Sequence, residues 1–130
     1  MKIKISVIDK LFSQYVRMRD KWTCQRCQRE YGPGELGLHC SHFHGRRKQS
    51  VRFEPDNAAA LCFGCHQHMH ESPYDHVVFM RKRLGIRRYQ SLVIQAETPK
   101  RPDYEAVKLW LRSMIKGMEK KDEGLILGKH

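Results

Sequence analysis

The feature that most constrains this sequence is a set of two Cys-x2-Cys pairs, Cys24 with Cys27 and Cys62 with Cys65. Four thiolates are enough to close a tetrahedral zinc site, and two-residue spacers suit the turns that present such ligands. Because four thiolates would fill the coordination sphere of Zn²⁺ and leave no position for a substrate, the pairs predict a structural zinc. An iron centre and redox-active thiols are the less favoured alternatives. A zinc held in this way joins distant segments and fixes the chain between them.

Length and charge bound the organisation of the chain and its partners. At 130 residues the sequence suits a single domain, with a core small enough for a metal to matter. Lys and Arg number 25 against 14 Asp and Glu, so the net charge of +11 favours a polyanionic partner. Ribosomal, membrane-surface and nucleic-acid proteins share such a composition. Charge therefore indicates a class of partner and leaves the activity open.

Apolar runs and cysteine count indicate the compartment. Residues 1–5 are too short in their apolar part for a signal peptide, and no apolar run approaches the ~18 residues of a membrane span. We therefore expect a cytoplasmic protein without a membrane partner. In a reducing compartment paired cysteines favour metal over disulfides, and the fifth thiol, Cys40, leaves an odd count that suits a disulfide framework poorly. Cys40 itself is expected to be a small core residue.

Periodicity and turn residues predict the elements around the first cysteine pair. A helix start at Ser6 and apolar residues at helical spacing predict an amphipathic helix that ends near Asp20. Two short strands are expected later in the chain, one within residues 36–44 and its antiparallel partner at residues 51–53. A basic turn would join them. The expected arrangement is a hairpin that follows the first cysteine pair.

The segment after the second cysteine pair is expected to be helical. His66 and His70 are four residues apart, so they lie on one face of a helix, and we expect that face to look at the strand that bears His42. Gly85 interrupts the apolar pattern that follows. Beyond the histidines we expect helices at residues 73–84, at residues 86–96 and from Tyr104 onwards, then a flexible tail at residues 122–130.

The chain has eight histidines, and several of them lie between or just after the cysteine pairs. The pattern resembles the HNH, or ββα-metal, nuclease family, in the form that has a Cys-x2-Cys pair on either side of the catalytic hairpin. The resemblance covers about residues 22–71. It rests on His42 in Ser41-His42-Phe43-His44-Gly45, on Asn57 in Pro55-Asp56-Asn57, and on His66 directly after the last cysteine.

The resemblance implies an α+β fold. A small ββα-metal hairpin-helix core at residues 22–71 would be stapled by the four-cysteine zinc site, and additional helices at residues 1–21 and 72–121 would surround it. The implied activity is metal-dependent hydrolysis of DNA phosphodiester bonds. A single divalent cation, Mg²⁺ or Mn²⁺, would be bound between hairpin and helix, and an imidazole ligand favours Mn²⁺ or a later transition metal.

The resemblance also implies a role for each matching residue. His42 would be the general base, because a neutral histidine can take a proton from water near pH 7. His66 would hold the divalent cation, which neutralises charge on the scissile phosphate. Asn57 would fix the hairpin and the orientation of the base, or contribute a ligand. The simpler alternatives are a hydrogen-bonded strand histidine for His42, a turn residue for Asn57, and a surface residue or zinc ligand for His66.

One residue departs from the family pattern. The position before the base commonly holds Asp or His as a metal ligand, but here it holds Ser41, a much poorer ligand. The spacing of His66 and His70 resembles the His-x3-His helix of the nuclease colicins, so His70 is the candidate that restores a ligand. A helix cap or a solvent-facing side chain is its alternative role. His39 and His44 are weaker substitutes.

Two basic stretches are candidate phosphate contacts. Arg46, Arg47 and Lys48 lie next to the expected base and would bind flanking DNA phosphates, since guanidinium matches phosphate bidentately. A solvated turn is the alternative. The second stretch, Arg81-Lys82-Arg83 with Arg87-Arg88, would extend these contacts and make binding salt-sensitive. Neither stretch carries a code for reading bases, so no target sequence is predicted.

Two further functions compete with the nuclease. A non-catalytic zinc-finger module that binds DNA or RNA would use the same four cysteines and basic residues, and Ser41 is its best support. Replacing His42 with Ala would leave such a module active but would abolish cleavage by a nuclease. A zinc-dependent structural partner in a larger phage or recombination assembly is the third reading. A homodimer would suit double-strand cleavage, although no interface is evident from the sequence.

Overall fold

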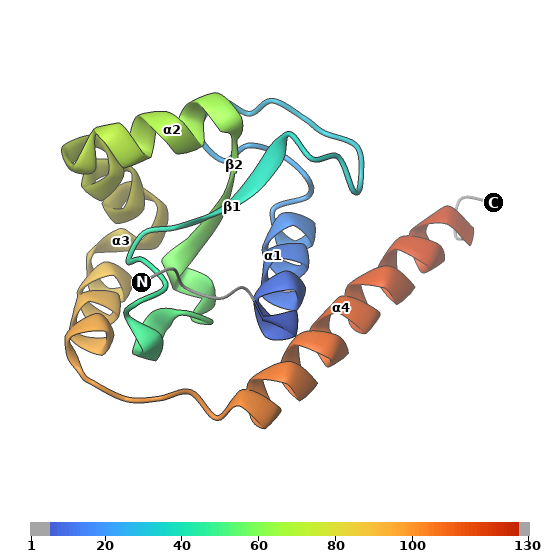
Figure 1. Cartoon of the computed structure of the whole chain (residues 1–130). Coiled ribbons are helices and arrows are strands. Elements are labelled where there is room, and N and C mark those ends of the chain that lie inside the picture. Colours follow the sequence, from blue (N-terminus) through green and yellow to red (C-terminus); the bar gives the residue numbers. More distant parts are fainter. Residues whose placement is uncertain (1–5, 128–130) are drawn as a thin grey trace.

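The structure is a computed structural model in which residues 6–127 are described. Residues 1–5, where no signal peptide is expected, and residues 128–130, the end of the expected flexible tail, lie outside this range. The elements are α1 (Val7–Arg19), β1 (Leu38–His42), two 3-10 helices (Gln49–Val51 and Pro55–Asn57), β2 (Ala58–Cys62), α2 (Phe63–Glu71), α3 (Pro73–Glu97) and α4 (Tyr104–Leu127). The chain thus mixes helix and sheet, as predicted (Figure 1). Among the described residues, no helix combines the length and apolarity that a membrane crossing requires.

Helix α1 begins where the sequence predicts it. The Ser6 hydroxyl accepts a hydrogen bond from the Asp9 amide (3.1 Å), and the Asp9 carboxylate accepts one from the Ser6 amide (2.8 Å). This reciprocal capping box satisfies two amides that the first helical turn leaves unpaired. Phe12, Tyr15 and Val16 bury the apolar face of α1, and the helix ends at Asp20 as its C-cap.

The sheet has two antiparallel strands, but the predicted partner of the first strand is wrong. β1 pairs with β2 from Leu38 opposite Cys62 to His42 opposite Ala58, whereas residues 51–53 form no strand. Val51 and Phe53 instead bury their side chains in two different apolar clusters. Strand β2 carries three alanines and a leucine, all buried, because α1 and α2 cover it from both sides. A strand buried on both faces lacks the alternation by which strands are recognised.

Helices α2 and α3 follow the sheet with almost no connecting chain. β2 leads directly into α2, whose N-cap is Cys62, and Pro73 begins α3 two residues after α2 ends. Gly85 has a positive φ of 78° and breaks α3 into two halves. The two predicted helices at residues 73–84 and 86–96 are thereby confirmed. The break lets the second half turn back so that Leu92 and Ala96 pack with Val51.

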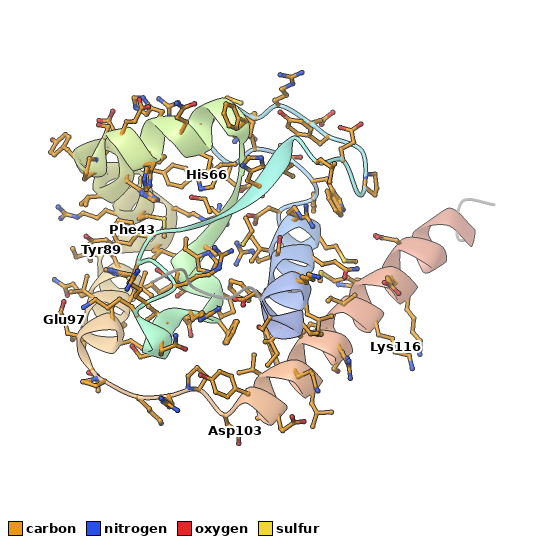
Figure 2. All side chains as sticks on the ribbon, viewed as in Figure 1. Phe43, His66, Tyr89, Glu97, Asp103 and Lys116 are labelled. Carbon is orange, nitrogen blue, oxygen red and sulfur yellow. The ribbon has the colours of Figure 1, made fainter. Side chains whose placement is uncertain are left out.

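Helix α4 packs on α1 and extends past it (Figure 1). Leu111 and Ile115 are buried against Phe12 and Val16 in the cluster that joins these helices. The prediction that a flexible tail begins at residue 122 is wrong, because α4 continues to Leu127. Figure 2 shows side chains filling the space between α1 and the sheet, while Lys116 on α4 points away from the body of the molecule.

Candidate metal centre and histidine site

The four cysteines of the two pairs come together where β2 meets α2. Their Sγ atoms all lie within 4.8 Å of one another, close enough to hold a metal ion such as zinc. Cys27 and Cys62, from different pairs, have Sγ atoms 3.8 Å apart. Among the described side chains, no other group of three or more His, Cys, Asp or Glu residues gathers its ligand atoms in this way. The donor set and its closeness fit a four-thiolate metal site.

Backbone hydrogen bonds shape the turn that presents the first pair. The Cys24 amide donates to the Arg29 carbonyl, and the Gln28 amide donates to the Cys24 carbonyl, each at 2.9 Å. Gln28 has a positive φ of 66°, which reverses the chain at this point. The Gln25 amide donates to the Ala60 carbonyl in β2 (2.9 Å). The turn that carries Cys24 and Cys27, here called the first knuckle, is therefore hydrogen-bonded to the sheet.

The second pair is placed by the junction of strand and helix. The Cys65 amide donates to the Sγ of Cys62 (3.4 Å), so the cysteine that ends β2 also caps α2. Burial raises the pKa of the Cys65 thiol to about 12, although the Arg26 guanidinium donates to its Sγ (3.5 Å). Burial would also raise the pKa of Cys24, but backbone hydrogen bonds outweigh it and lower that pKa to about 7. The two thiols therefore differ in acidity, and a bound cation would favour the deprotonated form of both.

His42, the expected general base, ends β1 and is largely enclosed. Its Nε2 lies 3.0 Å from the Arg52 carbonyl oxygen. A carbonyl can only accept, so Nε2 carries the proton and Nδ1 keeps a lone pair. Burial and, after it, the positive charge of Arg46 together lower the pKa of His42 to about 4, against the smaller upward effect of this hydrogen bond. The imidazole is therefore neutral at pH 7.

The carbonyl that orients His42 is itself held in place. Arg52 donates from Nε to one carboxylate oxygen of Asp9 (3.0 Å) and from a terminal nitrogen to the other (2.7 Å). Burial would raise the pKa of Asp9, but its hydrogen bonds with Arg52 and Ser6 outweigh it and hold the pKa below the ordinary value. Sequence reasoning missed both Asp9 and Arg52 as site residues. Asp9 belongs to the helix start predicted at Ser6, but no local signal connects residues as far apart in the chain as Asp9 and Arg52.

Asn57 is fully buried and ties down the loop between the base and Arg52. Its side-chain amide donates to the carbonyls of His44 (2.8 Å) and Val51 (3.1 Å), and its oxygen accepts from the His44 amide (2.8 Å). The Phe43 amide donates to the Asn57 carbonyl (2.8 Å). The side chain thus bridges both ends of residues 44–51 and uses both of its hydrogens in doing so.

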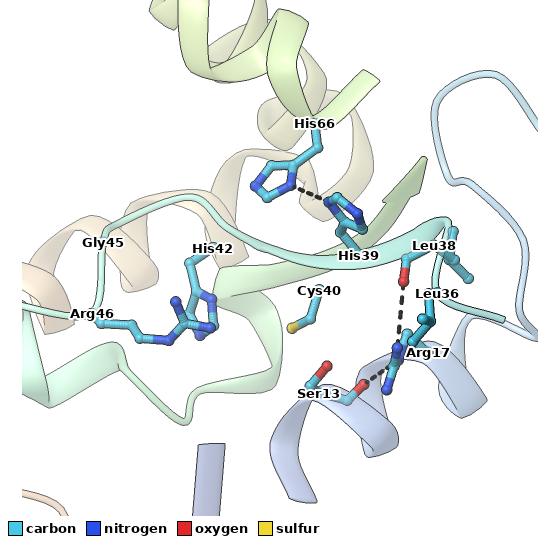
Figure 3. Close-up of a pocket in the computed structure, with 10 residues that line it drawn as sticks. All are labelled: Ser13, Arg17, Leu36, Leu38, His39, Cys40, His42, Gly45, Arg46 and His66. Carbon is cyan, nitrogen blue, oxygen red and sulfur yellow. Dashed lines mark hydrogen bonds between the residues drawn. The ribbon is translucent and has the colours of Figure 1, made fainter. Parts of the chain in front are cut away.

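His66 lies on the face of α2 that looks at β1, as the predicted helical face requires. Its Nδ1 is 3.0 Å from the Nδ1 of His39, and the two rings meet edge to face (Figure 3). Burial lowers the pKa of His66, and the charges that His39 and His70 would carry add to that effect. His70 lines a smaller neighbouring cavity together with His66. The imidazole within hydrogen-bond distance of His66 is thus His39, whereas the sequence favoured His70 as the second ligand.

Two cavities meet at these histidines. The larger, about 440 Å³, lies between β1, α1 and the loop after β1. It is lined by Ser13, Arg17, Leu36, Leu38, His39, Cys40, His42, Gly45, Arg46 and His66 (Figure 3). The smaller, about 140 Å³, is lined by Ser41, His42, His66, Met69, His70, Pro73 and His76. His42 and His66 belong to both, so the expected base and the expected cation ligand share one solvent-reachable region.

The predicted phosphate contacts fall into three environments. Arg46 lines the histidine cavity, 3.7 Å from Asp9, whereas Arg47 and Lys48 line a separate cleft beside the end of α3. In the second basic stretch, Arg83 is paired with Asp20, and Arg88 is paired with Asp56 in an exposed bidentate contact. These two arginines serve contacts within the chain. Cys40 packs against the α1–α4 cluster as expected, and burial raises its thiol pKa to about 12.

The chain matches no protein-family model, no curated protein and no solved structure. Its function is therefore inferred from the placement of its own residues. The cavity brings together the neutral imidazole of His42, the guanidinium of Arg46 and the paired imidazoles of His39 and His66. This arrangement can bind an anion and move a proton beside it. The four-cysteine cluster lies outside this cavity.

Proposed function

We propose that this chain is a metal-dependent endonuclease of the HNH, or ββα-metal, type that hydrolyses phosphodiester bonds in DNA. The single observation that carries the proposal is the placement of His42. Its Nε2 is engaged by the Arg52 carbonyl at 3.0 Å, and its ring lines a cavity together with Arg46 and His66. The order β1, β2, α2 and the two cysteine pairs on either side of the strands support the same assignment.

In the proposed reaction His42 acts as the general base. Its Nδ1 takes a proton from a water molecule, which then attacks the phosphorus atom while the 3′ oxygen of the cleaved bond leaves. With Nε2 fixed on a carbonyl, the ring has one orientation and one available nitrogen. Arg46 beside it would contact the scissile phosphate. That anion offsets part of the field that depresses the pKa of His42, so substrate binding makes the base stronger.

The divalent cation of this proposal would be held by imidazoles on α2 and β1. His66 lines both cavities, His39 lies 3.0 Å from it, and His70 lines the smaller cavity. When bound, the cation would neutralise charge on the scissile phosphate and the leaving oxygen. Ser41 is 3% exposed and offers only a hydroxyl where the family commonly has a stronger ligand. A set of imidazoles favours Mn²⁺ over Mg²⁺.

The proposed role of the four cysteines is structural. A zinc bound there would complete its coordination with thiolates, so it would hold the segments that carry β1, β2 and α2 together without contacting substrate. Asn57 supports the same geometry from inside, because it fixes the loop that runs from His44 to Val51. In this proposal zinc fixes the elements around the site, and a backbone carbonyl fixes the position of the base, His42.

Nicking of supercoiled plasmid DNA tests the proposal. The wild-type chain is assayed with Mg²⁺, with Mn²⁺ and with EDTA, beside His42→Ala and a control, His68→Ala. His68 also lies on α2 but pairs with Asp75 near the surface. Divalent-metal-dependent nicking that is lost in His42→Ala and kept in His68→Ala is the expected result, with one zinc per chain in all three proteins. Equal nicking by both variants would remove His42 as the base.

A non-catalytic nucleic-acid-binding module is the second candidate. It is favoured by Ser41 and by the finding that, within the described side chains, the histidines do not gather into a close ligand group as the cysteines do. Such a module would bind DNA in a salt-sensitive way and cleave it under none of these conditions. Binding without nicking by the wild-type chain is the result that would select it.

A further inference from the structure

A basic cleft separate from the histidine cavity lies where the loop after β1 meets the connection between α3 and α4. Its volume is about 430 Å³, and its lining includes four cationic residues, Arg47, Lys48, Lys100 and Arg101. All four are exposed, and Glu97 is the one carboxylate residue in the described lining. Two segments far apart in the sequence thus contribute positive charge to one concave surface, which is an arrangement that suits a polyanion.

Neutral side chains hold the two walls of this cleft together. The Ser50 hydroxyl donates to the Gln95 carbonyl (2.7 Å), and the Gln95 side chain donates back to the Ser50 carbonyl (3.1 Å). The Tyr104 hydroxyl donates to the Gln49 side chain (3.2 Å), which joins the start of α4 to the same loop. The cationic residues are therefore mounted on segments whose relative position is fixed by uncharged hydrogen bonds.

One loop contributes residues both to this cleft and to the histidine cavity. Arg46 lines the histidine cavity, and the next residue, Arg47, lines the basic cleft. Consecutive Cα atoms are about 3.8 Å apart, and a DNA strand carries a phosphate every ~3.4 Å along the helix axis, so one strand can reach both arginines. A strand whose scissile phosphate meets Arg46 would bring its next phosphates to Arg47 and Lys48 and then to the α3–α4 connection.

We propose that this cleft binds the DNA backbone beside the cleaved bond, with Lys100 and Arg101 as phosphate contacts. This inference rests on the proposed function, because it takes DNA as the partner of the adjacent histidine cavity. Phosphate contacts position a duplex without reading its sequence, and the cleft offers cations rather than groups arranged to read bases. Glu97 opposes the same phosphates and weakens the binding that the four cations provide.

The test measures the affinity of the zinc-loaded full chain for a fluorescent DNA duplex over a range of salt concentrations, without added Mg²⁺ or Mn²⁺. Lys100→Gln/Arg101→Gln is compared with Lys116→Gln/Lys120→Gln, which removes the same charge from exposed positions on α4. Glu97→Gln is compared with Glu119→Gln on α4. All substituted side chains are exposed, so circular dichroism and zinc content are expected to be unchanged.

The expected result is a loss of about tenfold in affinity for Lys100→Gln/Arg101→Gln, as for two exposed ion pairs, with a salt slope smaller by about two. Glu97→Gln should bind about twofold more tightly than wild type, a gain that a misfolded variant would not show. Equal losses in both double variants, or equal effects of both glutamate changes, would overturn the inference. If wild type nicks DNA but Lys100→Gln/Arg101→Gln binds DNA as tightly as wild type, the DNA-binding role of the cleft is refuted and the nuclease proposal stands. If that variant loses affinity for DNA but wild type does not nick DNA, the nuclease proposal is refuted and the DNA-binding role of the cleft stands.

Discussion

At the scale of single residues, the pKa of His42 reports how its surroundings are arranged. Burial is the main reason that this pKa is about 4, and the charge of Arg46 is the second. Arg46→Gln removes the second cause and leaves burial, the largest, in place, so the pKa should rise only part of the way toward the ordinary value of 6.5. NMR titration of the imidazole measures it. Arg29→Gln, which removes a cation that stacks on Tyr31, should leave the pKa unchanged, and an identical titration in all three proteins would contradict the assignment.

The same shift makes stability depend on pH. Native His42 resists protonation down to about pH 4, whereas in the unfolded chain it takes up a proton near pH 6.5. The unfolded state therefore binds more protons within this window, and the free energy of unfolding falls as the pH falls. The contribution of His42 should be a loss of about 2 kcal/mol from pH 7 to pH 5. Urea unfolding of wild type should show this loss in excess of His42→Gln, and parallel curves would refute it.

Asp9 is a residue whose importance depends on a distant partner. Its carboxylate caps α1 and accepts from two guanidinium nitrogens of the buried Arg52, whose carbonyl orients His42. Asp9→Asn removes the carboxylate charge that pairs with this guanidinium, so the free energy of unfolding should fall by about 3 kcal/mol. Asp75→Asn, at an exposed pair with His68, should change stability by less than about 0.5 kcal/mol. Equal urea midpoints for these two variants would show that the Asp9 pair is not a structural anchor.

At the scale of elements, the break in α3 depends on Gly85. Its φ of 78° with ψ of 163° lies in a region that is essentially reserved for glycine, although a Cβ there would meet no atom within 4 Å. Gly85→Ala should therefore destabilise the protein by about 1–3 kcal/mol through backbone strain alone. Thermal unfolding measures this change.

Gly117 in α4 provides the matched control for that substitution. Its φ is not positive, and an added Cβ would again meet no atom within 4 Å. Gly117→Ala should stabilise the protein by about 0.5–1 kcal/mol, because alanine loses less freedom when a helix forms. Opposite signs for two chemically identical changes would locate the effect in the backbone, while a loss of stability in both would show that packing decides.

The elements differ in how well the sequence predicts them. Helices α1, α2 and both halves of α3 follow from caps, spacing and Gly85, because each signal lies within a few residues. The partner of β1 does not, because Ala58–Cys62 is buried on both faces and lacks alternation, whereas Val51 and Phe53 look like strand residues. A strand pairing depends on what covers each face, which no short window of sequence contains.

The candidate site divides in the same way. Cys24, Cys27, Cys62 and Cys65 could be grouped from spacing alone, since their chemistry and their turns are local. The contacts of His42 with Arg52 and of His66 with His39 could not, because each joins side chains on separate segments. One wall of the basic cleft, which carries Arg47 and Lys48, could be predicted from the sequence as a candidate phosphate contact. The other wall comes from the α3–α4 connection, which reaches the loop only after α3 has turned at Gly85.

At the scale of the whole molecule, the cysteine cluster joins the turn after α1 to the junction of β2 and α2. The first knuckle follows α1, and the second lies between β2 and α2. The carboxylate of Asp20 accepts from the Ala60 amide (2.8 Å) and from Arg83 on α3 (3.0 Å), so the same region also ties three elements together by hydrogen bonds. A metal bound by the four thiolates would therefore stabilise the arrangement of α1, the sheet and α2 at once.

Replacing one thiol with a hydroxyl should show whether the fold depends on that metal. Cys62→Ser removes a ligand, so the variant should bind less than one zinc per chain. Because the binding free energy of a structural zinc contributes to the free energy of folding, the variant should also lose cooperative thermal unfolding. Cys40→Ser makes the same atomic change at a thiol outside the cluster, where it should keep one zinc per chain and cost about 1 kcal/mol. Elemental analysis and circular dichroism measure both. A Cys62→Ser protein that unfolds cooperatively near the wild-type temperature would mean that the apolar clusters alone hold these elements, and that the cysteines serve another purpose.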